Sequence, residues 1–123
     1  MTIIEAINHI DSLKPNSYTQ ADKIIWLSNL DGIIKNEIID THEGSENVTF
    51  DGYNAETALD TVLLVPAPYD DVYIKWLVAQ IDCANEETKR YTNSMIMYNT
   101  AYSTFERFYN RTHMPRGRKL KFF

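Results

Sequence analysis

Two residues could take part in metal binding or catalysis: one histidine in an acidic loop and one cysteine. His42 lies between Asp40 and Glu43, and imidazole and carboxylate groups are common metal ligands. No second cluster with ligand spacing follows, so a solvated surface loop is the better interpretation. Cys83 has no basic residue within a helical turn that would stabilise a thiolate, and it is predicted to be a small core residue.

Motifs that bind phosphate, hold zinc in an HExxH pair or present a nucleophile on a sharp turn are missing from the sequence. We therefore expect no enzyme, no catalytic residue, no metal site and no cofactor. An enzyme would need a pocket that gathers His42, Cys83 and acidic side chains, and the sequence gives no sign of one.

A second kind of chemistry is electrostatic, because the charges are unevenly distributed. Residues 1–106 contain all 17 Asp and Glu and six Lys or Arg, a net charge of −11, whereas residues 107–123 contain the other six bases and no acid, a net charge of +6. Such a terminus is attracted to phosphate or to an acidic protein surface, including a second copy. The candidate interaction residues are Arg111, Arg116, Arg118, Lys119, Lys121, Phe122 and Phe123.

Three interpretations of the basic terminus remain open: a solvated tail, a contact with nucleic acid, and a docking segment for an acidic protein surface, which we favour. Residues 116–123 cannot build a core of their own, so we expect a flexible basic arm that becomes ordered on binding. No helix-turn-helix is evident, and the acidic body would be repelled by phosphates.

Length and composition set the limits within which these residues must be positioned. The chain has 123 residues, with 44% hydrophobic and 24% charged residues, which is typical of a globular protein with one core. Residues 1–115 are predicted to form one helical domain. The apolar runs are far too short to span a bilayer, and the N-terminus lacks the pattern of a secretory signal, so we expect no membrane partner and an intracellular location.

Two helices are predicted at the N-terminus. Thr2 and Glu5 form a capping box before a helix over residues 3–13. Ser17 with Gln20 indicates the start of a second amphipathic helix over about residues 20–40, and the two helices would form a hairpin. Gly32 inside the second helix costs about 1 kcal/mol relative to alanine, so we expect a close contact or a weak point there.

Residues 41–69 have the composition of a long loop. We expect at most minor β structure in it: a short extended piece at residues 48–50, a helical turn at 54–60 and an extended stretch at 61–65 before Pro66 and Pro68. Connections of this length in compact domains are usually functional or make contacts.

The strongest helical pattern begins after Pro68, where Asp70 and Asp71 are predicted to cap a long segment over about residues 70–112. Apolar and aromatic residues recur in it at alternating spacings of three and four. One interpretation is a continuous helix about 63 Å long. The other is an antiparallel pair, with a reversal between residues 84 and 88 and Asn85 capping the second helix. The sequence leaves both open.

The second half of this segment is rich in aromatic residues, which favour either a core or a protein interface. We expect core positions for about half of Tyr91, Tyr98, Tyr102, Phe105, Phe108 and Tyr109. Trp26 and Trp76 flank the apolar seams, where they either widen the core face or mark a contact surface.

Three phrases carry a resemblance to a known family: WLSNLDGIIKNEIIDTHEG, LLVPAPYDDVYIKWLVAQID and NSMIMYNTAYSTFERFYNRTHMP. Over roughly residues 3–115 the chain resembles small proteins of tailed phages and Gram-positive prophages, which we associate with head-to-tail connector (adaptor) proteins. These are mostly α-helical subunits that join into a ring beneath the portal and complete the DNA-filled head. The resemblance brings no catalytic residues with it.

The resemblance implies a virion structural protein that self-assembles or docks on the portal or a tail-completion protein. It also implies assembly in the bacterial cytoplasm and a final place in the virion. The alternative is a small nucleic-acid-associated or regulatory prophage protein that uses the basic arm. Together with the periodicity, the expected fold is all-α: a helical hairpin, a long central loop with at most minor β structure, and a long C-terminal helical segment.

Overall fold

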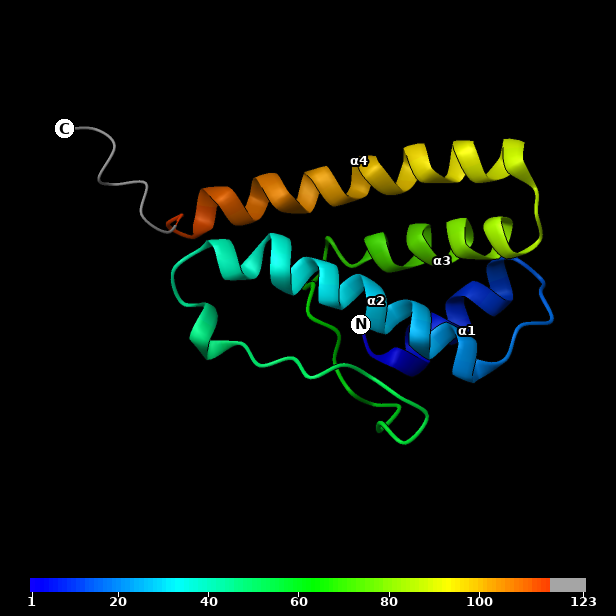
Figure 1. Ribbon diagram of the computed structural model, residues 1–123, viewed down its shortest axis with the longest axis horizontal. Coiled ribbons are helices and arrows are strands. Elements are labelled where there is room, and N and C mark those ends of the chain that lie inside the picture. Colours follow the sequence, from blue (N-terminus) through cyan, green and yellow to red (C-terminus); the bar gives the residue numbers. More distant parts are fainter. Residues whose placement is uncertain (116–123) are drawn as a thin grey trace.

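A computed structural model describes residues 1–115 of the chain (Figure 1). Its elements in order are α1 (Ile3–Leu13), α2 (Gln20–Glu37), two 3₁₀ turns η1 (Ile39–Thr41) and η2 (Ser45–Asn47), α3 (Asp71–Ala84) and α4 (Thr88–Thr112). Within residues 1–115 extended pairing is limited to isolated bridges at Thr2–Val62 and His42–Pro115. The all-α prediction is therefore confirmed, with minor β contacts made by the central loop.

The first helix has the predicted bounds. The amide of Glu5 donates to Thr2 Oγ1 at 3.3 Å, and the amide of Thr2 donates to Glu5 Oε1 at 2.9 Å, which completes the predicted capping box. In the second helix the predicted cap was wrong. Thr19 and Asp22 form the capping box of α2, because Thr19 directly precedes the helix with an extended backbone and Ser17 comes two residues too early.

The second helix also ends at Glu37 rather than at residue 40. The chain tightens there into η1, and the hydroxyl of Thr41 donates to the Ile38 carbonyl oxygen at 2.8 Å. This hydrogen bond satisfies a carbonyl that the helix end leaves without an amide partner.

The long C-terminal segment is an antiparallel pair, so the continuous helix is excluded. Asn85 is the C-cap of α3 and does not cap α4, while Glu86 adopts a left-handed backbone with φ 58° and turns the chain. The hydroxyl of Tyr18 donates to Asn85 Oδ1 at 2.5 Å, which ties this turn to the α1–α2 connection. The reversal lets the aromatic seam of α4 pack on α3 and α2 instead of projecting into solvent.

In Figure 1, α4 runs along one side of α3, and α1 and α2 lie on the other side. Buried residues from all four helices and from the central loop form one core cluster. Of the six aromatic residues in the C-terminal segment, Tyr98, Phe105 and Tyr109 are buried. Trp76 Nε1 donates to the Trp26 carbonyl oxygen at 2.8 Å, and both indoles pack against the core cluster, so they widen the core face.

The central loop crosses beneath α1 and α2 and returns to α3 (Figure 1). Residues 54–60 form turns rather than the expected helical turn. Of the expected extended stretch at 61–65, residues 61–63 pair with the N-terminus, whereas residues 64 and 65 form a bend. Ile3 donates to the Thr61 carbonyl oxygen at 3.0 Å, and Leu63 donates to that of Met1 at 2.9 Å. Leu63 and Val65 are buried, so the end of the loop belongs to the core.

Candidate functional site

The basic terminus lies only partly within the described residues. Arg111 is exposed in the last turn of α4, one turn after the exposed Arg107. The other predicted interaction residues lie outside the described residues: Arg116, Arg118, Lys119, Lys121, Phe122 and Phe123. The structure does describe the contacts of residues 113–115, which directly precede them, together with the surfaces nearby.

The described part of the chain ends beside the start of the central loop. The amide of Glu43 donates to the Met114 carbonyl oxygen at 2.8 Å, and His42 and Pro115 form an antiparallel bridge. Residue 115, the last described residue, is therefore held against residues 42 and 43.

His42 holds this junction together, and the prediction that it lies in a solvated loop was wrong. Its side chain is buried, with Nδ1 donating to the Ile38 carbonyl oxygen at 2.6 Å and Nε2 lying 2.7 Å from Oδ1 of Asn110. The ring also packs edge-on against Tyr109 at a centroid distance of 4.9 Å. Because both nitrogens are engaged by α2 and α4, His42 is a structural residue at the end of the domain.

A buried carboxylate anchors the central loop. Asp31 is fully buried in α2 and accepts hydrogen bonds from the hydroxyls of Tyr53 and Tyr73, both at 2.6 Å. It also accepts one from the amide of Leu64 at 3.2 Å. Burial raises the pKa of Asp31, while the tyrosine hydroxyls and the Leu64 amide oppose that rise. The middle of the loop at Tyr53 and its later part at Leu64 are thereby tied to α2, together with Tyr73 of α3.

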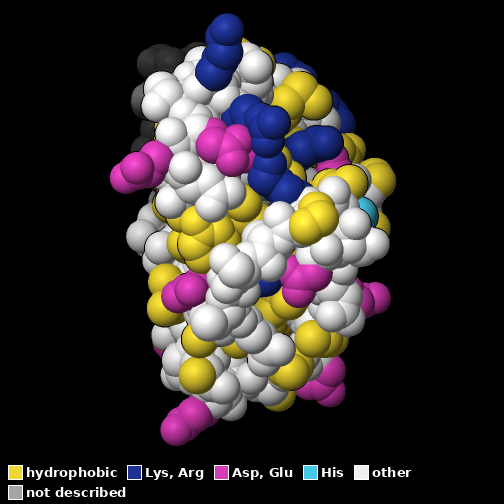
Figure 2. Space-filling model, turned by 90° about the vertical axis from the view of Figure 1, so that its right-hand side faces the viewer, with side chains coloured by type: hydrophobic (Ala, Val, Ile, Leu, Met, Phe, Trp, Pro, Cys, Tyr) yellow, Lys and Arg dark blue, Asp and Glu magenta, His cyan; other side chains and the backbone are white. Residues whose placement is uncertain are grey.

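This anchored loop carries the acidic surface of the protein. Residues 36–74 contain nine Asp or Glu and no Lys or Arg, since the bases on either side are Lys35 and Lys75. Figure 2 looks onto the end of the molecule that carries the α3–α4 turn, where most bases gather in the upper part and acidic side chains are spread over the rest of the face. By sequence, residues 36–74 and residues 107–123 carry net charges of opposite sign.

A second buried carboxylate joins three elements near that turn. Asp82 of α3 lies 2.7 Å from Lys14 Nζ, and it accepts a hydrogen bond from the hydroxyl of Ser94 in α4. Burial raises the pKa of Asp82, but the Lys14 ammonium and the Ser94 hydroxyl outweigh that effect and leave it below its usual range. The α1–α2 connection, α3 and α4 are held in register by this ion pair.

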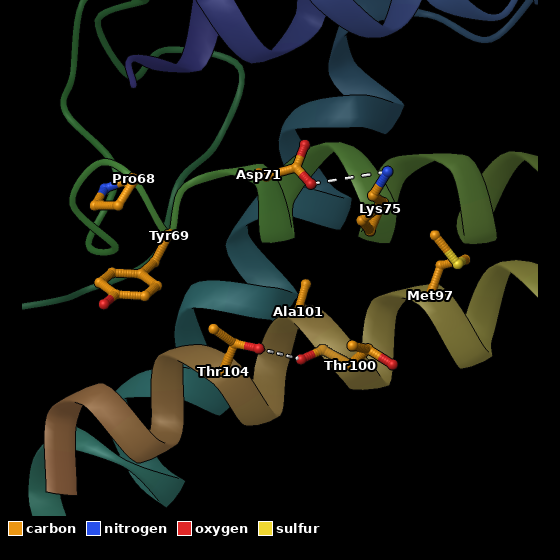
Figure 3. Close-up of a pocket in the computed structure, with 8 residues that line it drawn as sticks. All are labelled: Pro68, Tyr69, Asp71, Lys75, Met97, Thr100, Ala101 and Thr104. Carbon is orange, nitrogen blue, oxygen red and sulfur yellow. Dashed lines mark hydrogen bonds and ion pairs between the residues drawn. The ribbon is translucent and has the colours of Figure 1, made fainter.

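A groove runs between α3 and α4 on the side away from the buried seam. Its main cavity has a volume of about 260 Å³ and is lined by Pro68, Tyr69, Asp71, Lys75, Met97, Thr100, Ala101 and Thr104. Figure 3 shows Met97 and Ala101 of α4 pointing toward α3, with Tyr69 closing one end. A second cavity of about 190 Å³ shares Lys75 and Met97 and extends the groove toward Asn93.

The groove is mostly apolar and remains open to solvent. The Met97 side chain is 54% exposed, and the neighbouring Ile96 is 58% exposed. At one end the ring of Tyr69 stacks on Phe108 with centroids 4.5 Å apart, which gives this end a rigid aromatic wall. Asp71 and Lys75 form an ion pair of 3.7 Å at the rim. An open methionine-lined groove of this kind fits protein side chains, because methionine adapts to irregular apolar partners.

The structure does not bring the candidate catalytic groups together. Cys83 is exposed in the last turn of α3, so the prediction of a core position was wrong; its neighbours Ile81 and Asp82 take the inward face of that turn. His42 contacts Asn110 near the end of α4, whereas Cys83 lies beside Thr88 at its beginning. Among residues 1–115 no cluster of three or more His, Cys, Asp or Glu could hold a metal ion.

Two functional features escaped the sequence analysis. The burial of Asp31 had no signal beyond a polar residue within an apolar stretch of α2, and its partners lie 22 to 42 residues away. The groove depends on the reversal between α3 and α4, which the periodicity left undecided. The spacing of Met97, Ala101 and Thr104 places them on one helix face in both interpretations, but only the reversal brings Asp71 and Lys75 of α3 alongside that face.

Comparison of the chain with protein-family models, with curated proteins and with solved structures finds no match. Among the described helices, none is long and apolar enough to cross a membrane. The function must therefore be argued from the surfaces of the chain itself.

Proposed function

We propose that this chain is a structural subunit of a tailed-phage or prophage virion that acts as a head-to-tail connector (adaptor). In this role it assembles with copies of itself or docks on the portal or a tail-completion protein. Three features support the proposal: the all-helical fold, the separate locations of His42 and Cys83, and the surfaces described above. The phrases quoted from the sequence point the same way.

The observation that carries the proposal is the pair of unlike surfaces on one small domain. Residues 36–74 supply nine acids without a base, and residues 107–123 supply six bases without an acid. Subunits that meet through two different surfaces form rings when the rotation between neighbours closes. A self-complementary dimer interface does not need this asymmetry. Opposite charge also steers the approach of the partners before the closer contacts form.

Light scattering over a range of protein concentration and salt tests the proposal. We expect a discrete oligomer at low salt that dissociates as salt screens the charges. Replacing the adjacent bases Arg118 and Lys119 by serine should weaken assembly. The matched control replaces Lys89 and Arg90, an exposed adjacent pair at the other end of α4, and should leave assembly unchanged. Equal behaviour of the two double variants would refute the role of the terminus.

A nucleic-acid-associated protein is the second candidate, and the position of Arg107 and Arg111 favours it. Both are exposed one turn apart on α4, next to the four bases that follow Pro115. Binding to phosphates predicts an affinity for DNA that falls steeply with salt and needs no partner protein. A salt titration of DNA binding, with the Arg118 and Lys119 variant as control, separates this function from a connector.

A further inference from the structure

We propose that the groove between α3 and α4 receives residues 116–123 of a second copy of this chain. The inference rests on the proposed function and deepens it, because it names the surface that accepts the basic arm. The groove supplies apolar walls at Tyr69, Met97 and Ala101 with the Asp71 carboxylate at the rim. The arm supplies Leu120, Phe122 and Phe123, with bases between and before them.

The size and openness of the groove favour side chains over a small molecule. Small-molecule sites are usually clefts or cavities that bury most of the ligand surface. The main cavity here is about 260 Å³, continues into a second one of about 190 Å³, and is open along its length. An extended segment whose aromatic side chains enter successive cavities matches this shape. Large aromatic anchors in apolar pockets dominate the energy of such interfaces.

The charges at the rim suit the same occupant. The Asp71 side chain is 59% exposed, and its Oδ2 lies 3.7 Å from Lys75 Nζ. The carboxylate is therefore open to solvent and can accept a second cation. Asp70 lies beside it and pairs with the N-terminal ammonium at 3.5 Å. A basic segment that enters here would place Lys121 or Lys119 near Asp71 while its aromatic residues fill the groove. Charge steers the encounter, and the apolar contacts hold the bound segment.

The exit point of the chain indicates a second copy rather than the same molecule. Tyr109, Asn110 and His113 face the junction at His42, where residue 115 is held. At 100° per residue this face of α4 lies about 160° from the face formed by Met97, Ala101 and Thr104. Residue 115, the last described residue, is thus held on the side of α4 opposite to the groove of the same chain.

The length of the arm makes the intramolecular route unfavourable. Eight residues span at most about 26–29 Å when fully extended. Passing halfway around a helix 10–12 Å across while returning from Thr112 to Thr104 takes a path of about 20–22 Å, because the two displacements are perpendicular. About six of the eight residues would be needed to reach the near edge of the groove of the same chain, which leaves only about two residues to enter it. A neighbouring copy can present its groove without this constraint, which produces a head-to-tail contact.

Disulfide trapping between two differently tagged copies tests this contact in the full chain, with Cys83→Ser in both. One copy carries Lys121→Cys in the arm, which keeps both phenylalanines. The other carries Thr100→Cys at the groove, or Thr92→Cys as a matched control about two turns away on a different face of α4; both positions are exposed. Circular dichroism establishes that each variant remains helical.

We expect about tenfold more heterodimer with Thr100→Cys than with Thr92→Cys, the factor that burial of one aromatic anchor provides. Adding Phe122→Ala and Phe123→Ala to the arm should remove the preference. Equal trapping at the two positions overturns the proposal. So does a chain carrying both Lys121→Cys and Thr100→Cys that forms only an intrachain disulfide at low concentration.

The failure of this inference is distinguishable from the failure of the proposed function. Light scattering on the Cys83→Ser chain reports assembly independently of trapping. An oligomer that shows no preference for Thr100→Cys overturns the groove as the acceptor and leaves the connector function in place. DNA binding without assembly or trapping overturns both.

Discussion

The buried Asp31 offers the sharpest test of how the central loop is held. In the substitution Asp31→Asn one acceptor oxygen becomes an amide nitrogen. Oδ2 of Asp31 accepts from Tyr53 and Leu64, and Oδ1 accepts from Tyr73. The remaining oxygen of asparagine can serve only one of these two sets.

The magnitude follows from the group that loses its acceptor. If the asparagine oxygen keeps the Tyr53 and Leu64 bonds, the hydroxyl hydrogen of Tyr73 is left without a partner. The Tyr73 side chain is fully buried, and its oxygen already accepts from the amide of Val65 at 2.7 Å. A buried donor without an acceptor costs about 1–3 kcal/mol. We expect Asp31→Asn to lower the free energy of unfolding by this amount near neutral pH.

The pH dependence of this loss has a definite sign. Burial raises the pKa of Asp31 above its ordinary value of 3.8, so the folded state binds the proton more tightly than the unfolded state. The natural chain therefore loses stability as pH rises from about 4 through the raised pKa. The asparagine variant cannot ionise and lacks this loss. The difference in unfolding free energy between the two chains is consequently larger at about pH 4 than at about pH 7.

Urea unfolding followed by circular dichroism at both pH values measures the difference. Asp82→Asn is the matched control, because the pKa of Asp82 is lowered and its stabilisation is lost as pH falls through that lowered pKa. The two variants should show opposite pH trends. A loss in Asp31→Asn that is constant or grows with pH would mean that the hydrogen bonds outweigh burial, and the reasoning would be refuted.

Three further substitutions test local features. Gly32→Ala should raise the free energy of unfolding by about 0.5–1 kcal/mol in urea titrations, because its Cβ would lie 3.8 Å from Cε2 of Phe50, an ordinary contact; destabilisation would contradict this packing. His42→Ala should cost about 1–3 kcal/mol and speed amide exchange at residues 109–113 but not in α1. The exposed Cys83 thiol should react with a thiol reagent without denaturant, and Cys83→Ser should change stability by less than about 0.5 kcal/mol.

The charge pattern of the candidate site could be predicted from the sequence, because it depends on composition alone. The separation of acidic and basic residues holds in any fold that leaves them exposed, and Arg111 is exposed as its place in the pattern implies. The groove was not readable. It exists because Met97 and Ala101 of α4 line it together with Lys75 of α3. These helices lie side by side only because the chain reverses between them, and the heptad pattern did not require that reversal.

The sequence by itself determined the first helix, the all-helical class and the unequal distribution of charge, since these arise from neighbouring residues and from counts. Thr2 and Glu5 cap α1 through contacts three residues apart. Only the tertiary structure decided between one long helix and two, and it alone placed Asp31 and His42 inside and Cys83 outside. Those outcomes depend on partners far along the chain, such as Asn110, 68 residues from His42. Local propensity cannot report such contacts, because packing of distant segments determines which polar groups lose water.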